Sequence, residues 1–289
     1  MRVLVTGSSG RIGRAIFVRL ALEHEVLGLD RSPSSTAHIC GDVASADVAR
    51  RALFGVDAII HTAALHAPQV GLVKESEFRR INVQATRMLA EMAADAGIRS
   101  FIFTSTTALY GHAVTAASKA SWLDEGLVPE PRTIYHETKI EAEALLKDIA
   151  ETVGLSVVAL RMSRCFPEPA PVMAAYRLHR GVDARDVADA HACALEKEYP
   201  GFRKYVISGA TPFHVEDAAL LHETASAVIQ DREPLLAEAF ALRGWRLPET
   251  IDRVCDPSRA MTELGWVPRF GFKEVLRMLD EQSSEVLPP

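Results

Sequence analysis

The sequence has few of the features that mark nucleic-acid-binding or membrane proteins. It has no run of five or more basic residues, and 38 acidic against 32 basic residues give a formal net charge of -6. Because a nucleic-acid-binding surface needs clustered positive charge, we expect no nucleic-acid partner. No apolar run reaches the ~18 residues of a membrane-spanning helix, so we expect no membrane partner. The opening residues lack the pattern of an export signal, which predicts a cytoplasmic protein.

The four cysteines are too scattered for a zinc site or a disulfide framework. Cys40, Cys165, Cys193 and Cys255 lie far apart and show no CxxC spacing, whereas such sites usually cluster their cysteines. The ten histidines show no HxxxH or HExxH pattern. We therefore expect buried, reduced thiols and no bound metal.

Short apolar runs alternate with longer amphipathic stretches over the first 160 residues. Strands are expected at 3–6, 26–30, 58–61, 101–105 and 157–160, and helices at 12–23, 75–96 and 135–153. Apolar runs without polar alternation are typical of strands covered on both faces. The order predicts an α/β fold with a doubly wound, Rossmann-type parallel sheet, whose ligands bind at the carboxyl ends of the strands.

A glycine-rich loop follows the first expected strand and opens the first expected helix. Glycines permit a tight turn and a close approach of the backbone to a diphosphate, and the free N–H groups of the helix start bind that anion. A plain glycine-rich turn is the alternative. The loop residues expected to bind a dinucleotide are Gly7, Ser9, Gly10, Arg11, Ile12 and Gly13.

Asp30 ends the second expected strand, 17 residues beyond the last glycine of the loop. A carboxylate there accepts hydrogen bonds from the adenosine ribose and repels a 2′-phosphate, which favours NAD. The adjacent Arg31 is placed to hold that phosphate, so NADP is the alternative. Asp42 and Val43 follow the third expected strand and suit an adenine contact; the alternative is that Asp42 caps the helix that follows.

Beyond residue 160 the alternation changes, and a smaller unit is expected. The proline-rich run 165–172 is expected to form no regular element, whereas a helix at 185–196 and a strand at 205–208 are expected to rejoin the sheet. The expected division is a dinucleotide-binding domain at 1–163, completed by about 184–208, and a small C-terminal substrate lobe made of 164–183 and 209–289.

Tyr135 and Lys139 stand four residues apart at the start of an expected helix, so their side chains share one face. An ordinary phenol has a pKa of about 10, and a neighbouring ammonium group together with the charged nicotinamide ring would lower it toward the range useful for proton transfer. The fifth expected strand ends in the hydroxyl-rich run 104–107, which is placed to hydrogen-bond a substrate oxygen. A turn or helix cap is the alternative for that run.

Together these residues resemble the extended short-chain dehydrogenase/reductases of the NAD-dependent epimerase/dehydratase family. The resemblance covers nearly the whole chain. It rests on the runs 6–13, 42–43, 61–64, 82–83, 104–111 and 135–139, on Arg161, and on 181–188 and 264–268. It implies an enzyme that uses a nicotinamide dinucleotide.

Positions that match the family motifs imply roles for individual residues. Thr106 would steady the oxyanion, Tyr135 would be the acid–base group, and Lys139 would tune the tyrosine and bind the nicotinamide ribose. His61 is expected to be a satisfied buried histidine. The further residues expected to line or support the cofactor site are Ala63, Ala64, Asn82 and Thr104.

Two departures from the family concern the substrate. Family members that act on nucleotide-sugars usually carry asparagine at the position of Arg164. Between the positions of Cys165 and Arg180 they have a segment several times longer than the one found here, which has about 15 residues. Because this segment grips the nucleotide, its shortness implies a small substrate. The run 161–169 is similar to that of uronate dehydrogenases, but Val172 and Met173 stand where those enzymes carry a carboxylate-binding arginine.

The leading hypothesis is therefore an NAD(P)-dependent oxidoreductase that moves a hydride between nicotinamide and a small sugar, sugar acid or related compound. An NAD-dependent nucleotide-sugar epimerase or dehydratase is the alternative, and a non-catalytic dinucleotide-binding protein is the third. Candidate substrate contacts are His66, Thr107, Arg164 and Arg177, with Arg180 as a further candidate; each arginine is equally explained as a surface charge.

The resemblance also implies a homodimer. In this family two helices of each subunit pair across a twofold axis, and the matching helices here are expected at 75–96 and 135–153. The alternative is that the apolar residues of these helices only cover the sheet.

Overall fold

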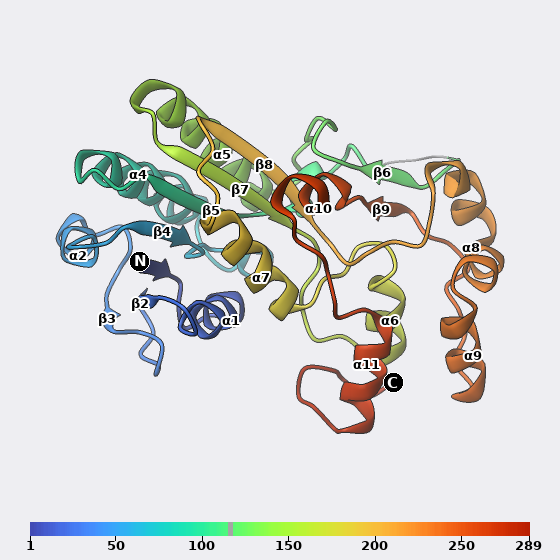
Figure 1. Ribbon diagram of the computed structural model, residues 1–289. Helices are drawn as coiled ribbons and strands as arrows, with labels where there is room; N and C mark the ends of the chain where they lie inside the picture. Colours follow the sequence, from blue (N-terminus) through green and yellow to red (C-terminus); the bar gives the residue numbers. More distant parts are fainter. Residues whose placement is uncertain (115–117) are drawn as a thin grey trace.

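The computed structural model describes residues 1–114 and 118–289, and these form a seven-stranded parallel sheet with helices on both faces (Figure 1). The strand order is β3-β2-β1-β4-β5-β7-β8. The strands are β1 (Arg2–Thr6), β2 (Glu25–Asp30), β3 (Ile39–Cys40), β4 (Ala58–His61), β5 (Ser100–Thr106), β7 (Ser156–Met162) and β8 (Phe202–Ile207). Because the order reverses between β1 and β4, the expected doubly wound sheet is confirmed.

Both faces of the sheet are buried, which explains why its strands read as continuous apolar runs. Helices α2 (Ala46–Ala52), α4 (Ala85–Asp95) and α5 (Ile134–Val153) cover one face, and α1 (Arg11–Leu20) and α7 (Ala184–Leu195) cover the other. Along β1, Leu4 packs into the first of these cores, and Val3 and Val5 pack into the second. This alternation follows from the two-residue period of a strand.

The expected helix at 75–96 is one helical run with an irregular middle. It begins as α3 (Glu75–Arg79), continues through a π-helical turn (Arg80–Gln84) and ends as α4. The sequence did not predict the π turn. π turns inside helices often occur at functional sites, where they redirect a side chain, and Asn82 lies in this one.

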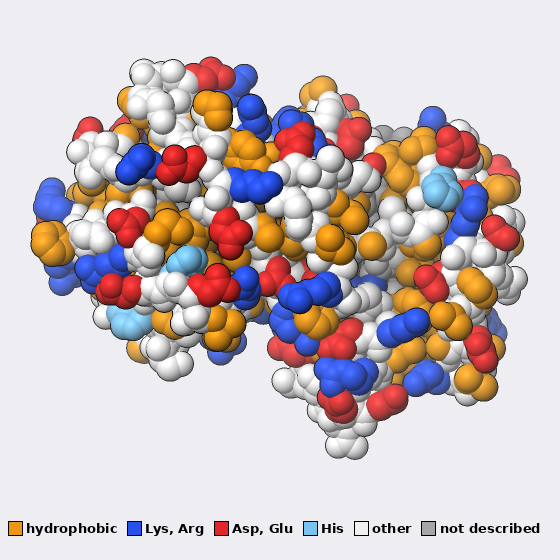
Figure 2. All heavy atoms as spheres, viewed as in Figure 1, with side chains coloured by type: hydrophobic (Ala, Val, Ile, Leu, Met, Phe, Trp, Pro, Cys, Tyr) orange, Lys and Arg blue, Asp and Glu red, His pale blue; other side chains and the backbone are white. Residues whose placement is uncertain are grey.

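A second unit lies beside the carboxyl ends of the strands (Figure 1). Its elements are α6 (Ala170–Tyr176), α8 (Ala218–Arg232), α9 (Pro234–Leu242), α11 (Phe272–Asp280) and a small parallel sheet of β6 (Ser121–Leu123) and β9 (Arg253–Cys255). These share one apolar core. By contrast, α10 (Ser258–Leu264) and the buried Trp266 pack beneath the main sheet. Figure 2 shows a notch between the sheet and the projecting part of this lobe.

The proline-rich run 165–172 corrects one expectation, because its last three residues form the first turn of α6. Pro171 stands in that first turn, where the N–H that proline lacks would have no partner within the helix. Met173 follows it and is buried. A proline-rich run therefore ends here in a helix start.

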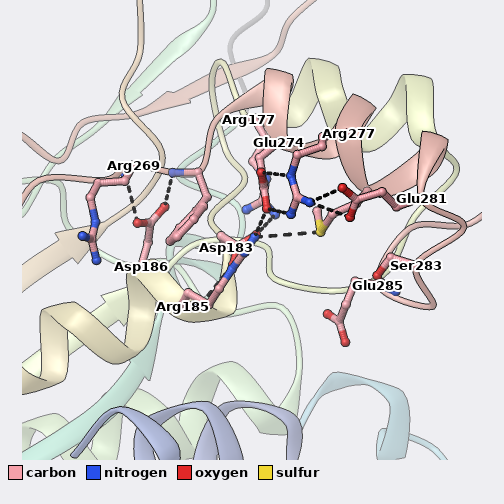
Figure 3. Close-up of polar contacts among 12 residues, drawn as sticks. Arg177, Asp183, Arg185, Asp186, Arg269, Glu274, Arg277, Glu281, Ser283 and Glu285 are labelled. Atoms are coloured by element: carbon pink, nitrogen blue, oxygen red, sulfur yellow. Dashed lines mark hydrogen bonds and ion pairs between the residues drawn. The ribbon is translucent and has the colours of Figure 1, made fainter. Parts of the chain in front are cut away.

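The lobe is attached to the start of α7 by a cluster of charged side chains (Figure 3). Asp183 accepts hydrogen bonds from the backbone N and the Nε of Arg185, and Arg185 also pairs with Glu274 of α11 at 2.7 Å. Asp186 accepts from the backbone N atoms of Arg269 and Phe270 at 2.8 and 3.0 Å. These bonds fix α11 against the sheet.

Within the described residues, no helix is long and apolar enough to cross a membrane, and no three His, Cys, Asp or Glu side chains group as metal ligands. All four cysteines are free. Cys165 and Cys255 are buried, whereas Cys193 is half-buried and Cys40 is exposed, contrary to expectation. It ends β3, the edge strand of the sheet, where a side chain has fewer neighbours to cover it.

Candidate active site

A cavity of about 470 Å³ follows the carboxyl ends of the central strands and reaches the lobe. It brings together most of the residues predicted from the sequence. Those that line it are Gly7, Gly10, Arg11, Ile12, Gly13, Asp30, Arg31, Asp42, Val43, Ala63, Ala64, His66, Thr104, Thr106, Thr107, Tyr135, Lys139 and Arg164. Ser9, Asn82 and Arg177 are not among its lining residues.

The glycine-rich loop has a geometry that only glycine permits. Gly7 has a φ of +71°, and a Cβ atom there would lie 2.6 Å from Oγ1 of Thr62. A Cβ atom on Gly13 would lie 2.0 Å from the carbonyl oxygen of Gly7. The loop therefore packs backbone against backbone, and the start of α1 is bare of side-chain caps, as a diphosphate cradle requires.

Arg11 extends this cradle and is also tied to the C-terminal segment. Its guanidinium group forms an ion pair with Glu285. Figure 3 shows Glu285 in the segment beyond α11. The residue after Glu285, Val286, is buried, and the backbone of Leu287 bonds to Glu168 and Ala170 beside α6. The segment beyond α11 therefore connects the glycine-rich loop with the lobe.

Asp30 lies at the end of β2, and its carboxylate is held by backbone groups. One oxygen accepts a hydrogen bond from the N of Ser9 at 2.9 Å, and the other accepts from the N of Ser32 at 2.8 Å. Each oxygen keeps a lone pair for a ribose hydroxyl. Ser9 thus positions the carboxylate and does not itself line the cavity, whereas Arg31 lines the same end.

Asp42 lines the cavity after β3 and does not cap a helix. One of its oxygens accepts from the N of Ala44 at 2.9 Å, forming a local turn, and the other pairs with Arg80 at 2.8 Å. Ser45 occupies the N-cap position of α2. The capping alternative is therefore wrong, because the N-cap position of α2 lies three residues beyond Asp42.

Thr106, Tyr135 and Lys139 come together where β5 ends and α5 begins. The side chain of Thr106 accepts from the N of Ala108 at 3.1 Å and also hydrogen-bonds the hydroxyl of Tyr135. It therefore both closes a turn and faces the tyrosine. The Nζ of Lys139 donates to the carbonyl oxygen of Thr104 at 2.7 Å and lies 4.2 Å from the ring centroid of Phe103.

Burial controls the pKa values of this pair. It raises the pKa of Tyr135 to about 12, and the hydrogen bond from Thr106 opposes the rise only in part. It lowers the pKa of Lys139 to about 7, against the attraction of Glu143. Desolvation of the phenol therefore dominates in this structure, and Lys139 alone does not bring the pKa of Tyr135 below its ordinary value.

A buried ion pair one turn beyond Lys139 supports the site and was not anticipated. Glu143 pairs with Arg161 of β7 at 2.6 Å and accepts from the hydroxyl of Ser105 at 2.5 Å. Arg161 also donates to the hydroxyl of Tyr110 at 3.0 Å. These contacts fix α5 against β5 and β7. The four-residue spacing of Lys139 and Glu143 was the available signal, since it places both on one helix face.

Asn82 supports the site from outside the cavity. Its side chain accepts from the N of Leu65 and donates to the carbonyl oxygen of Leu65, both at 2.8 Å. It also donates to the hydroxyl of Thr138 at 3.0 Å. It therefore joins the loop that carries Ala63 and Ala64 to α5.

His61 is a structural residue, as the sequence indicated. Its ring is 1% exposed and is hydrogen-bonded to Thr6 at 2.7 Å and to Thr86 at 2.9 Å. Burial, followed by the charge of Lys139, lowers its pKa to about 3. The ring is therefore neutral and joins β1, β4 and α4.

Only some of the candidate substrate residues line the cavity. His66, Thr107 and Arg164 line the cavity, together with Arg180. Arg177 does not: it is 3% exposed and pairs with Asp183 at 3.0 Å (Figure 3). The last turn of α6 directs it inward, so we withdraw it as a substrate contact. Arg253 lines the cavity and was missed, because no motif surrounds it.

The sequence matches the NAD dependent epimerase/dehydratase family over residues 3–170, which is more than half of the chain. The protein belongs to this family and is therefore an NAD-dependent enzyme. The match includes the glycine-rich loop and the group of Thr106, Tyr135 and Lys139.

Similar proteins have names that indicate different substrates. A 3-beta-hydroxysteroid dehydrogenase of Mycolicibacterium neoaurum is 32% identical over 176 residues, covering 56% of this chain and 47% of the relative. An NAD-dependent glucose-6-phosphate dehydrogenase of Haloferax volcanii is 26% identical over 215 residues, covering 68% of this chain and 81% of the relative. A dTDP-D-glucose 4,6-dehydratase of Mus musculus is 25% identical over 316 residues, covering 96% of this chain and 86% of the relative. The chain thus spans less than half the length of the first relative.

Solved structures share the fold along the whole chain. A short-chain dehydrogenase/reductase superfamily protein of Agrobacterium tumefaciens with bound NAD has a TM-score of 0.71 at 19% identity, covering 98% of this chain and 99% of that one. MoeE5 in complex with UDP-glucuronic acid and NAD has a TM-score of 0.68 at 24% identity, covering 96% and 97%. At these identities the likeness concerns the fold.

Proposed function

We propose that this enzyme is an NAD-dependent dehydrogenase of carbohydrate metabolism in the cytoplasm, acting on a small sugar, sugar acid or related hydroxy compound. The observation that carries the proposal is the presence of Thr106, Tyr135 and Lys139 in the cavity that also contains the glycine-rich loop and Asp30. This arrangement places a proton-transfer group and a dinucleotide cradle along one continuous space. NAD is favoured over NADP by the carboxylate at the end of β2.

The residues of the chain divide the chemistry among themselves. NAD, when bound, supplies the hydride acceptor. Tyr135 exchanges the proton of the reacting hydroxyl, and the side chain of Thr106 steadies the oxygen beside it. Because burial raises the pKa of Tyr135 to about 12, the neutral phenol suits proton donation to a carbonyl. Acting as a base requires positive charge beside the ring, which stabilises the phenolate.

The small size of the substrate is inferred from the segment between β7 and α7. This segment contains only the seven-residue α6 and short connections, and Met173 of α6 packs into the lobe core. No long insert is available there to enclose a nucleotide. The Haloferax volcanii relative, whose name is NAD-dependent glucose-6-phosphate dehydrogenase, is one family member with a small sugar substrate.

The experiment is a measurement of absorbance at 340 nm with purified protein, NAD and a panel of free aldoses, uronic acids and sugar phosphates. Growth of the signal with one compound supports the proposal. Tyr135→Phe should lower that rate by about 10²- to 10⁴-fold and leave NADH binding, measured by fluorescence, unchanged. A panel-wide lack of NADH formation by protein that binds NADH would contradict the proposal.

A nucleotide-sugar epimerase or dehydratase is the second candidate. The observation that favours it is that dTDP-D-glucose 4,6-dehydratase of Mus musculus and MoeE5, with UDP-glucuronic acid, match along 96% of this chain. In such a reaction NAD is regenerated in every cycle, so no NADH accumulates. Purified protein that retains NAD, gives no signal at 340 nm and converts a nucleotide-sugar would establish this candidate.

We also propose a homodimer through α3, α4 and α5. Their outer faces carry charged pairs, among them Arg79 with Glu137 at 3.2 Å, so the interface would be polar at its rim. Ala144 is exposed at the centre of the outer face of α5. Sedimentation of the wild type as a dimer, and of Ala144→Arg as a monomer, would support the assembly; a monomeric wild type at micromolar concentration would contradict it.

A further inference from the structure

We propose that the substrate carries an anionic group, a carboxylate or a phosphate monoester, and that Arg164, Arg180 and Arg253 form the subsite that binds it. The inference rests on the proposed dehydrogenase function, whose substrate class it narrows. All three residues line the cavity that contains Tyr135 and Thr106.

The three arginines come from separate segments and converge on one another. The backbone N of Arg164, just beyond β7, donates to the carbonyl oxygen of Arg180 at 2.9 Å. The two guanidinium groups lie 5.9 and 4.1 Å from the ring centroid of Tyr176. Arg180 and Arg253 in turn share Asp252, at 3.6 and 2.6 Å. Arg180 therefore lies at the centre, between a shared ring and a shared carboxylate.

The charges around this cluster leave an excess of positive charge. Glu168 pairs with Arg164, and Asp252 serves both other arginines, so two carboxylates face three guanidinium groups. Neither carboxylate lines the cavity, whereas all three arginines do. The members of this cluster that line the cavity are therefore all cationic. Guanidinium groups offer five N–H donors each, and these pairs occupy only some of them.

The acidic residues that do line the cavity belong to its other end. Asp30 ends β2 and Asp42 follows β3, where the adenosine half of the dinucleotide is expected. Arg11, the arginine of the diphosphate cradle, is on α1. Arg253 lies in β9, next to Cys255, which also lines the cavity on the lobe side. The cationic cluster is therefore placed to bind substrate and not the cofactor diphosphate.

A surface role explains Arg180 and Arg253 poorly, whereas Arg164 is 48% exposed. The side chains of Arg180 and Arg253 are each 26% exposed, so most of each is withdrawn from water. The Nε of Arg180 is buried and has no hydrogen-bond acceptor among the described residues. Withdrawing like charges from water is unfavourable unless an opposite charge compensates them. An anionic substrate group supplies that charge through paired, charge-assisted hydrogen bonds.

The test measures binding without turnover. Isothermal titration calorimetry with the NADH-bound protein compares three sets of stereochemically matched compounds: neutral aldoses, hexuronates and hexose 6-phosphates. Binding of one anionic set at least about tenfold more tightly than its neutral match is expected, because a charge-assisted hydrogen bond is stronger than the bond that a neutral hydroxyl accepts. The set that binds identifies the group as carboxylate or phosphate. Equal binding of neutral and anionic compounds, or binding of the neutral set alone, would overturn the inference.

Variants then assign the binding to the cluster. Arg253→Gln and Arg180→Gln should each weaken binding of the anionic compound about 10- to 100-fold, and Arg253→Lys should retain part of it. The matched control is Arg243→Gln, because Arg243 is 29% exposed and paired with Asp280 in the same lobe but does not line the cavity. An equal loss in the control would contradict the assignment.

The inference and the proposed function can fail separately. Tight binding of a sugar anion without NADH formation at 340 nm would retain the anion subsite and reject the dehydrogenase. NADH formation from a neutral aldose, at the same kcat/KM as from its uronate and 6-phosphate, would retain the dehydrogenase and reject the subsite. Failure of every anion to bind the NADH-bound protein would also reject the subsite.

Discussion

The ammonium group of Lys139 donates a hydrogen bond to the backbone carbonyl of Thr104 at 2.7 Å, in surroundings that leave the lysine 4% exposed. This bond joins the start of α5 to the end of β5 and so fixes the distance between the catalytic helix and the strand that carries Thr106. Burial makes the charged form of Lys139 unfavourable in this position and so lowers its pKa to about 7.

We therefore expect Lys139→Met to be more stable than the wild type below pH 7, by on the order of 2–4 kcal/mol. Between pH 7 and the ordinary lysine pKa of about 10.4, the unfolded wild-type chain binds one more proton than the folded chain. Wild-type stability therefore rises with pH in this window, and the advantage of the variant disappears by about pH 10. Urea unfolding at pH 6, 8 and 10 measures the difference.

The control for this prediction is Lys147→Met on the same helix, whose side chain is 56% exposed. It should shift stability equally at all three pH values. A Lys139→Met protein that is less stable than the wild type at pH 6 would mean that the hydrogen bond to Thr104 outweighs the cost of burying the charge.

The second prediction concerns the choice of cofactor. Asp30→Asn removes a negative charge from the cavity but keeps an oxygen for the N of Ser9 or Ser32. Because like charges placed together cost several kcal/mol, the ratio of NADPH to NADH affinity should rise by on the order of 10- to 100-fold. Nicotinamide fluorescence measures both dissociation constants without a substrate.

Arg31 supplies the matched comparison. Arg31→Gln alone should leave NADH affinity unchanged, and in the Asp30→Asn background it should reverse part of the gain in NADPH affinity. An Asp30→Asn protein whose affinities for NADH and NADPH change by the same factor would show that the carboxylate does not sense the 2′ position.

The cofactor end of the site was predictable from sequence because its determinants are local. The glycine-rich loop, with the positive φ of Gly7, is specified by consecutive residues. Asp30 is placed by the end of one strand, and Tyr135 and Lys139 by one helical turn. Period and spacing are properties of the chain itself, so they can be read without knowing the fold.

The substrate end was not predictable because its determinants are tertiary. Arg253 enters the cavity only because β9 pairs with β6, and no spacing predicts a three-residue strand paired across such a distance. Arg177 and Arg180 are three residues apart, yet the first is buried on Asp183 and the second lines the cavity. Which of the two arginines faces the cavity depends on the packing of α6 against α11, which the sequence pattern does not encode.

The third prediction concerns the ion pair between Arg11 and Glu285. Because a bound diphosphate competes with Glu285 for the same guanidinium group, Glu285→Gln should strengthen NADH binding. The pair is partly exposed, so the gain should be only about two- to fivefold, and it should shrink at high salt. Glu281→Gln is the control, because Glu281 pairs with Arg277 and not with the loop. Unchanged affinity in Glu285→Gln would mean that the tail and the diphosphate do not compete.

The fourth prediction is a steep loss of stability in acid, caused by three buried histidines. Burial lowers the pKa of His61 to about 3 and the pKa values of His179 and His191 to about 4. Each ring is held by hydrogen bonds: His61 by Thr6 and Thr86, His179 by the carbonyl oxygen of Arg253, and His191 by the hydroxyl of Thr104 and the carbonyl oxygen of Val187.

As pH falls below the ordinary histidine pKa of about 6.5, these three histidines become protonated in the unfolded chain but stay neutral in the folded chain. Stability is therefore lost from about pH 6.5 downward, by up to ~4 kcal/mol per pH unit when all three contribute. Urea unfolding at half-unit steps from pH 7 to 4.5 gives the slope. His61→Gln should reduce the slope by about one proton, whereas His214→Gln, at an exposed position, should not. An unchanged slope in His61→Gln would show that this ring takes up its proton without unfolding, and hence that the hydrogen bonds to Thr6 and Thr86 do not hold it neutral.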